Sequence, residues 1–388
     1  MTVFQVESER AGRAERALLV SVAAGRRDDP DAVEELTQLA LSAGLAPVGH
    51  LTVRRDRPDP AHYIGSGKVE ELRAMAAAGE AGLVVFDVAL SPAQQRNLER
   101  TLGLWVLDRT ALILDIFSQR ARSREGKLQV ELAQLEHLST RLVRGWSHLE
   151  RQRGGLGKTG GPGEKQIELD RRMIGVRMKQ LRERLKQLER QRRTRRRARS
   201  RRDVLSVSLV GYTNAGKSSL FNALTRAGAY AADQLFATLD TTSRRLHVGA
   251  GVTVVLSDTV GFIRGLPHQL IEAFKSTLDE TAEADLLLHV VDSAAPARAE
   301  QMAEVDRVLE EIGAGSVPRL IVFNKIDASG REPAIERDPC GSIVAVSVSA
   351  KTGQGLDLLR DAIADHAQRA RLSVHPESTS AWTSAAVA

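Results

Sequence analysis

The sequence predicts an α/β protein in which an N-terminal α/β domain carries a long antiparallel helical hairpin and is followed by a second α/β domain. Three observations support this prediction. Strand-like and helix-like segments alternate over residues 1–123 and again over 203–370, as is typical of mostly parallel sheets flanked by helices. Residues 124–202 instead carry apolar residues at helical spacing. The chain has 388 residues, too many for a single core, and residues 371–388 are expected to form a flexible tail.

Within residues 1–123, apolar runs predict strands and amphipathic segments between them predict helices. The expected strands are 17–22, 48–53, 83–88 and 104–107, and the expected helices are 31–43, 68–77 and 92–102.

The middle region predicts two helices joined by a glycine-rich tip. Apolar residues recur through 128–149 and again through 167–188, with the steps of a heptad seam in the second series. Helices of about 26 residues would form an arm of roughly 40 Å. The tip, residues 154–163, contains six glycines and a Gly-Lys-Thr, but Gln152 stands where a phosphate-binding loop needs glycine. The tip is therefore expected to approach a partner rather than to hold a nucleotide.

The net charge of +6 is unevenly distributed. Residues 171–202 contain sixteen Lys or Arg and two Asp or Glu, a local charge of +14, which leaves about −8 on the rest of the chain. A basic arm on an acidic body favours a polyanionic partner, most simply nucleic acid, over a merely solvated helix face.

Cysteine content and hydropathy indicate the class of compartment. The single cysteine, Cys340, excludes a disulfide framework or a cysteine-built metal site and is compatible with a reducing compartment. No stretch approaches the ~20 apolar residues of a membrane span. We therefore expect a soluble, cytoplasmic protein without stable membrane insertion, although the basic helix could meet anionic lipid.

One segment completes the phosphate-binding pattern G-x-x-x-x-G-K-[ST]. It follows the apolar strand 205–210 and precedes the helical segment 219–225, so backbone N–H groups and the helix dipole would face the phosphates. Lys217 is expected to reach the β- and γ-phosphates, and the Ser218 hydroxyl to bind Mg²⁺. The predicted phosphate-binding residues are Gly211, Tyr212, Thr213, Asn214, Ala215, Gly216, Lys217 and Ser218.

Two further segments predict that the base is guanine. The Asp327 carboxylate, in an Asn-Lys-Ile-Asp run after the strand 320–323, can accept two hydrogen bonds from the N1–H and N2–H₂ groups of guanine. Adenine offers no such pair of donors, so the choice favours GTP over ATP. The residues expected around the base are Asn324, Lys325, Ile326, Asp327, Ser349, Ala350 and Lys351.

Two loops are expected at the metal and the γ-phosphate. Asp258 would contact Mg²⁺ through water and the Gly261 N–H would contact the γ-phosphate, with Thr238 completing the metal shell when that phosphate is present; Thr241 or Thr242 could compete for this role. The predicted metal ligands are Ser218 and Thr238, and the predicted catalytic residues are Lys217, Thr238 and Gly261. The remaining predicted nucleotide contacts are Phe236, Ala237, Leu239, Asp240, Thr259 and Val260.

Phe262 follows Gly261, at the position where Ras-type enzymes carry a glutamine that orients the attacking water. Phenylalanine cannot hydrogen-bond water, so we expect slow hydrolysis by the free protein and a bound partner that completes the site. Asn214 could also help hold a K⁺ ion.

Over about residues 58–366 the chain resembles the HflX family of translation-factor-class GTPases. The segments that carry the resemblance beyond the nucleotide motifs are 63–68, 90–98, 108–110, 119–129, the glycine loop through Glu164, and 258–268. The resemblance implies a GTPase that binds the large ribosomal subunit and its RNA, and that separates stalled ribosomes into subunits. We further expect GTP and GDP as ligands, Mg²⁺ as cofactor and a monomeric protein. Two alternatives remain open, a large-subunit assembly GTPase and an RNA- or membrane-associated switch.

Overall fold

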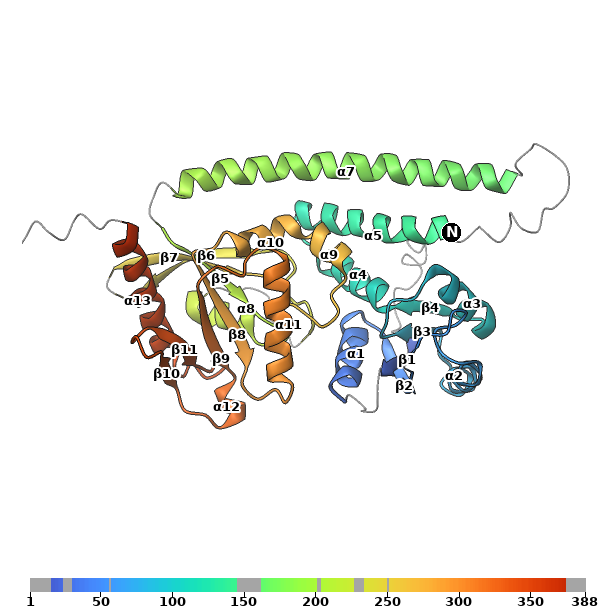
Figure 1. Cartoon of the computed structure of the whole chain (residues 1–388), viewed down its shortest axis with the longest axis horizontal. Coiled ribbons are helices and arrows are strands. Elements are labelled where there is room, and N and C mark those ends of the chain that lie inside the picture. The colour runs from blue at the N-terminus through green and yellow to red at the C-terminus, as the bar shows by residue number, and fades with distance from the viewer. Residues whose placement is uncertain are drawn as a thin grey trace, which may run out of the picture. The chain divides into compact units, whose positions relative to one another are not determined.

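The computed structural model describes residues 15–23, 30–55, 57–144, 162–200, 204–226, 234–249 and 251–374, which form two compact units (Figure 1). Unit 1 comprises Met1–Arg190 together with two short later segments, Gln234–Phe236 and Leu266–Phe274. Unit 2 comprises Gln191–Asp233, Ala237–Gly265 and Lys275–Ala388.

Unit 1 contains a four-stranded parallel sheet with strand order β2-β1-β3-β4. Side chains of the strands, among them Leu18 and Phe86, pack with buried residues of α2 and α3 in one core. The expected strands and helices of this region are confirmed, with β3 ending two residues earlier than predicted. The elements are β1 Arg16–Ala23, α1 Pro30–Ser42, β2 Ala46–Arg54, α2 Ser66–Ala78, β3 Leu83–Phe86, α3 Pro92–Leu102 and β4 Trp105–Asp108.

The sequence patterns did not predict the next helix, α4 (Arg109–Arg120). It is buried almost all round, so it lacks the one-sided apolar stripe by which a surface helix is recognised. Its start is fixed by Asp108, whose carboxylate accepts the Ala111 N–H at 2.8 Å.

The middle region forms α5 (Arg124–Arg144) and α7 (Pro162–Ser200), which run in opposite directions in Figure 1. Ion pairs connect them, Arg177 to Glu131 at 2.6 Å and Arg182 to Glu136 at 2.7 Å. Most of the predicted tip, residues 154–161, lies outside the described residues, and Pro162 and Gly163 begin α7.

Unit 2 contains a seven-stranded sheet with strand order β10-β11-β9-β8-β5-β7-β6, parallel except for the two edge strands. α13 continues to Val374, into the predicted tail, and residues 375–388 lie outside the described part of the chain. The strands are β5 Ser206–Val210, β6 Thr242–Val248, β7 Val252–Asp258, β8 Leu286–Asp292, β9 Arg319–Asn324, β10 Ala334–Arg337 and β11 Ile343–Ser347. The helices after α7 are α8 Lys217–Thr225, α9 His268–Ala273, α10 Lys275–Ala282, α11 Arg298–Glu311, α12 Ile326–Ser329 and α13 Leu356–Val374.

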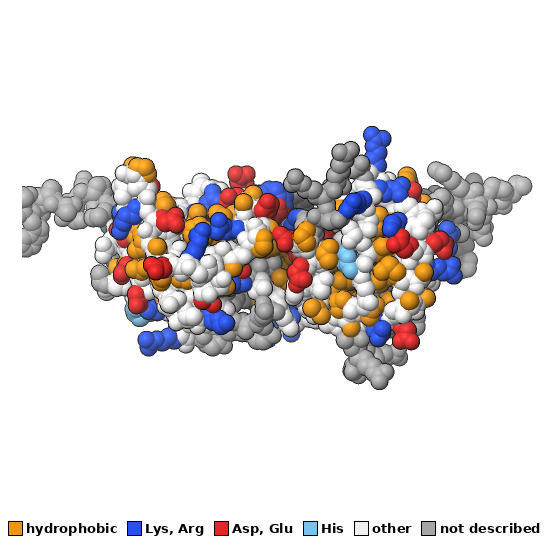
Figure 2. Space-filling model, turned by 90° about the horizontal axis from the view of Figure 1, so that it is seen from below, with side chains coloured by type: hydrophobic (Ala, Val, Ile, Leu, Met, Phe, Trp, Pro, Cys, Tyr) orange, Lys and Arg blue, Asp and Glu red, His pale blue; other side chains and the backbone are white. Residues whose placement is uncertain are grey.

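Among the described residues, no helix is both long enough and apolar enough to cross a membrane. The surface drawn in Figure 2 intermixes acidic and basic side chains, with hydrophobic side chains between them. That mixture contrasts with the basic composition of residues 171–202.

Candidate nucleotide-binding site

The phosphate-binding loop connects the end of β5 to the start of α8 and requires glycine at two positions. Gly211 has φ +147°, and a Cβ there would lie 2.2 Å from the Val290 carbonyl oxygen of β8. Gly216 has φ +90°, and its Cβ would lie 2.3 Å from the Asn324 amide nitrogen. Backbone and side chains therefore approach this loop too closely for any larger residue.

Lys217 begins α8 with its ammonium group enclosed by the loop. Its Nζ donates to the carbonyl oxygens of Gly211 at 3.0 Å and Tyr212 at 2.7 Å. Burial lowers the pKa of Lys217 to about 8, against an opposing effect of the Asp258 carboxylate. A phosphate beside this group would stabilise its charged form, so the loop is suited to an anionic ligand.

Three oxygen-bearing side chains, from α8, from the loop before β6 and from the end of β7, meet beside the phosphate-binding loop. The Ser218 hydroxyl donates to Asp258 Oδ2 at 2.7 Å, and the Thr238 hydroxyl donates to the same oxygen at 2.9 Å. The two hydroxyl oxygens are 2.7 Å apart. Of Thr238, Thr241 and Thr242, Thr238 is therefore the one whose hydroxyl contacts both Ser218 and Asp258.

These side chains suit a Mg²⁺ ion. Burial raises the pKa of Asp258, and its Oδ1 atom is buried without a hydrogen-bond partner among the described residues. Hydroxyl and carboxylate oxygens are the ligands that Mg²⁺ takes together with phosphate oxygens, and the ion, when bound, offsets phosphate charge. Elsewhere in the described residues, no group of three or more His, Cys, Asp or Glu side chains could hold a metal ion.

The segment after Asp258 is hydrogen-bonded to the phosphate-binding loop. The Phe262 N–H donates to the Gly211 carbonyl at 3.1 Å, and the Thr213 N–H donates to the Phe262 carbonyl at 2.7 Å. A Cβ on Gly261 would lie 2.9 Å from Lys217 Nζ and 3.0 Å from the Thr213 Cα, so a larger residue here would force the loop to shift. The Phe262 ring is fully buried, which makes this residue a packing anchor between the two loops.

The residues expected around guanine also lie together. Asn324, at the end of β9, donates to the Ala215 carbonyl at 2.9 Å and accepts the Ala350 N–H at 3.0 Å, so it joins the phosphate loop to the 349–351 segment. Asp327 Oδ1 accepts the Ser349 hydroxyl at 2.6 Å, which fixes the orientation of the carboxylate.

Other predicted contacts are placed differently. Lys351 is exposed and Leu239 is buried. The Phe236 ring packs against Phe117 within unit 1. Thr241 Oγ1 is buried without a hydrogen-bond partner among the described residues.

Sequence reasoning missed one residue and one contact at this site. Asp292, the last residue of β8, forms an ion pair of 2.7 Å with Lys325 and so holds the guanine-recognition segment. An acidic residue at the end of a buried strand was the available signal. The Tyr212 hydroxyl accepts the Arg264 N–H at 2.9 Å, a contact that no local pattern indicates.

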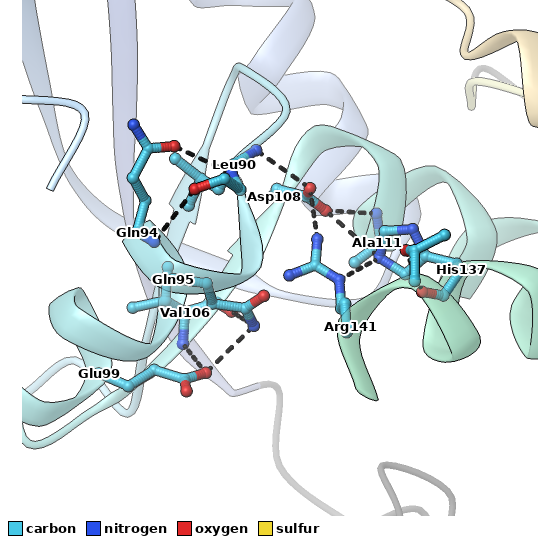
Figure 3. A network of polar contacts seen from close by, with 11 residues as sticks. Leu90, Gln94, Gln95, Glu99, Val106, Asp108, Ala111, His137 and Arg141 are labelled. Carbon is cyan, nitrogen blue, oxygen red and sulfur yellow. Dashed lines mark hydrogen bonds and ion pairs between the residues drawn. The ribbon is translucent and has the colours of Figure 1, made fainter. Parts of the chain in front are cut away.

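The segments around residues 90–98 and 108–110 form a separate polar network in unit 1 (Figure 3). Asp108 is buried and accepts hydrogen bonds from the Leu90 N–H and from Arg141 of α5, the latter at 2.7 Å. Ser91 and Gln94 form a reciprocal capping box at the start of α3. These motif residues hold sheet and helices together.

Comparisons with known proteins match the chain along most of its length. A GTP-binding GTPase N-terminal family matches residues 30–118, a GTP-binding GTPase middle-region family matches 120–199, and a 50S ribosome-binding GTPase family matches 206–325.

Among curated proteins, GTPase HflX of Escherichia coli is 52% identical over 92% of this chain and 84% of its own length. GTPase HflX of Caldanaerobacter subterraneus is 48% identical over 92% of this chain and 81% of its own. A solved GTP-binding protein of Sulfolobus solfataricus in complex with GDP aligns at 25% identity with a TM-score of 0.48, over 92% of this chain and 99% of that one.

Proposed function

The chain belongs to the GTPase HflX family and is a GTPase that hydrolyses GTP to GDP and phosphate; on this premise we propose that its GTP form binds the large ribosomal subunit and separates ribosomes into subunits. The observation that carries the proposal is that one chain combines the predicted guanine-nucleotide residues with the basic helix α7. The match of residues 206–325 to a 50S ribosome-binding GTPase family supports the same partner.

α7 offers the charge that ribosomal RNA requires. Exposed cationic side chains along it include Arg171, Arg172, Lys179, Arg184, Lys186 and Arg190. Each phosphate that such a side chain neutralises releases counterions, so binding should weaken steeply as salt concentration rises.

Sucrose-gradient profiles test the proposal. Intact ribosomes are incubated with the protein and GTP, GDP or a non-hydrolysable GTP analogue, and free subunits are quantified. Subunit release with GTP and with the analogue, but not with GDP, supports the proposal. Binding restricted to immature large subunits would instead establish an assembly GTPase, and absence of any ribosomal binding would contradict both.

A matched pair of triple variants tests the role of α7. Replacing Arg171, Arg172 and Arg184 with glutamine should lower the slope of log affinity against log salt by about 2, because fewer phosphates are neutralised. The control replaces three exposed arginines outside α7, namely Arg73, Arg244 and Arg245. Equal effects of the two triple variants would contradict a specific role for α7.

We further propose that the ribosome stimulates hydrolysis and that Asn214 supports a K⁺ ion. Phe262 is fully buried, so it cannot orient the attacking water. Single-turnover rates with and without large subunits should therefore differ by orders of magnitude. Replacing K⁺ by Na⁺ should slow the wild-type protein and leave Asn214→Ala unaffected; equal wild-type rates in both salts would remove K⁺ from the proposal.

A further inference from the structure

Two short segments that flank the nucleotide loops belong to unit 1. Gln234–Phe236 ends two residues before Thr238, and Leu266–Phe274 begins five residues after Gly261. Both segments pack within the compact unit that contains helix α4, whereas residues 237–265 belong to unit 2.

An aromatic cluster on α4 holds both segments. The Phe117 ring contacts the Phe236 ring edge-on, with centroids 4.8 Å apart and an interplanar angle of 88°. It contacts the Phe274 ring in the same manner, at 5.0 Å and 81°. All three rings are buried, so each contact adds edge-to-face attraction to the burial of apolar area.

Hydrogen bonds fix the backbone of the first segment as well. The Leu235 N–H donates to the Ser42 hydroxyl at 3.0 Å, and both residues are buried. The Arg120 guanidinium donates to the Gln234 side-chain oxygen and to the Ser42 carbonyl. Each residue of Gln234–Phe236 thus has its own contact with α1 or α4.

Phe236 adopts a backbone conformation that bulky residues rarely take. Its φ is +55°, in the left-handed region, where a residue with a Cβ pays a steric cost. Such a conformation persists where surrounding contacts over-determine it, and it occurs most often at switches and ligand sites. Two residues later, Thr238 lies against Ser218 and Asp258.

We propose that Phe117 and Ser42 of unit 1 are positioning residues for Thr238. Phe117 and Ser42 fix Phe236 and Leu235, and this limits the positions that Thr238, two residues further along the chain, can adopt. The entropy cost of ordering Thr238 when GTP binds is therefore lower. This inference rests on the proposed role of Thr238, which is to complete the metal shell when the γ-phosphate is present. Phe117 thus contacts both of the segments that flank the nucleotide loops in the sequence.

The test compares affinity for a non-hydrolysable GTP analogue with affinity for GDP in the full-length protein. Phe117→Leu should weaken analogue binding roughly tenfold relative to GDP, the scale of one residue's backbone ordering. Ser42→Ala, a smaller change less prone to unfold the protein, should shift the same ratio roughly threefold through loss of one hydrogen bond. kcat for GTP hydrolysis should fall in the same order.

Matched controls separate positioning from general stability. Phe86→Leu removes the same volume from the core of unit 1, and Ser21→Ala removes another buried hydroxyl of that unit, 3.0 Å from the His50 ring. Both controls should leave the ratio of affinities unchanged at whatever Tm they reach. The proposal is overturned if Phe117→Leu lowers the affinities for the analogue and for GDP equally. It is also overturned if the controls shift the ratio of the two affinities as much as the variants do.

Thr238→Ala distinguishes this inference from the assignment on which it rests. A lowered ratio in Thr238→Ala together with an unchanged ratio in Phe117→Leu and Ser42→Ala removes the positioning role alone. An unchanged ratio in Thr238→Ala removes the proposed role of Thr238, and the positioning role with it.

Discussion

Unit 1 and the nucleotide site both bury charged groups, but they treat them in opposite ways. In unit 1 the Arg109 guanidinium is paired with both Glu35 and Asp87. Burial would lower the pKa of Arg109, yet these two carboxylates raise it above its usual value. At the nucleotide site, burial lowers the pKa of Lys217 and raises that of Asp258, so each charged form is destabilised.

The opposite pKa shifts of Arg109 and Lys217 distinguish a buried charge that maintains the fold from one that is suited to bind a charged ligand. A paired ion contributes little net stability, but removal of one partner leaves an uncompensated charge. An ion whose pKa is shifted toward its neutral form already bears that cost, and a ligand of opposite charge relieves it. The shifted pKa values of Lys217 and Asp258 indicate a site built for a charged ligand. So does the buried Oδ1 atom of Asp258, which has no hydrogen-bond partner among the described residues.

The largest expected effect follows from removing the lysine of the nucleotide site. Lys217→Met should lower GTP hydrolysis by on the order of 10²–10³-fold, since a preorganised charge on the phosphates is lost. Because burial depresses the pKa of Lys217 to about 8, the destabilisation grows as pH falls from about 10.5 to about 8 and is complete below that. The variant without nucleotide should therefore be as stable as wild type or more stable by about 1–3 kcal/mol at pH 7.

Urea titration without nucleotide and single-turnover hydrolysis check the two halves of this prediction. A variant that loses stability and activity together would show that Lys217 maintains the fold, and the contrast with Arg109 would disappear.

The converse change in unit 1 is expected to affect stability and spare nucleotide binding. Arg109→Met should cost about 3–5 kcal/mol, because Glu35 and Asp87 are left without their shared cation. GDP affinity of the folded fraction should equal that of wild type. Chemical denaturation with isothermal calorimetry measures both, and weakened GDP binding by the folded variant would contradict the division between the two regions.

His289 differs from both Arg109 and Lys217, because this buried histidine is neutral at pH 7. Burial lowers the pKa of His289 to about 4, from a value near 6.5 in the unfolded chain. The unfolded state therefore binds more protons between these values, and stability should fall as pH decreases from 6.5 toward 4. The loss due to this residue should be about 2–3 kcal/mol by pH 4.5.

His289→Asn removes this proton-linked loss, so its stability should change less than that of wild type over the same pH range. Denaturation midpoints at several pH values supply the comparison. Parallel pH profiles of variant and wild type would show that the histidine is not the titrating group.

The elements that could be predicted are those whose pattern is local. Strands β1 to β4 appeared as apolar runs, and α1 to α3 appeared as segments of helical pattern between them. α4 was missed because its residues are apolar on nearly every side, so its sequence carries no period that distinguishes a buried helix.

The nucleotide site divides in the same way. Glycines, Lys217, Asp258 and Asp327 could be located because their spacing follows from the shape of the ligand. The contact of Phe236 with Phe117 joins residues 119 positions apart and depends on packing alone. Sequence patterns predict local backbone conformation and ligand-binding motifs. They do not predict which side chains far apart in the sequence pack together in a core.

The smallest predicted effect concerns a neutral polar contact of unit 1. The Ser91 hydroxyl accepts the Gln94 N–H at 3.2 Å, and the Gln94 side chain accepts the Ser91 N–H at 2.9 Å. Ser91→Ala should cost about 1 kcal/mol, since one helix-end donor loses its partner while Gln94 keeps its hydrogen bond to Asp59. Thermal unfolding measures the cost, and GTP hydrolysis should be unchanged because no charge is exposed or left unpaired. A cost near that of Arg109→Met would mean that unit 1 depends on its whole polar network rather than on its paired ions.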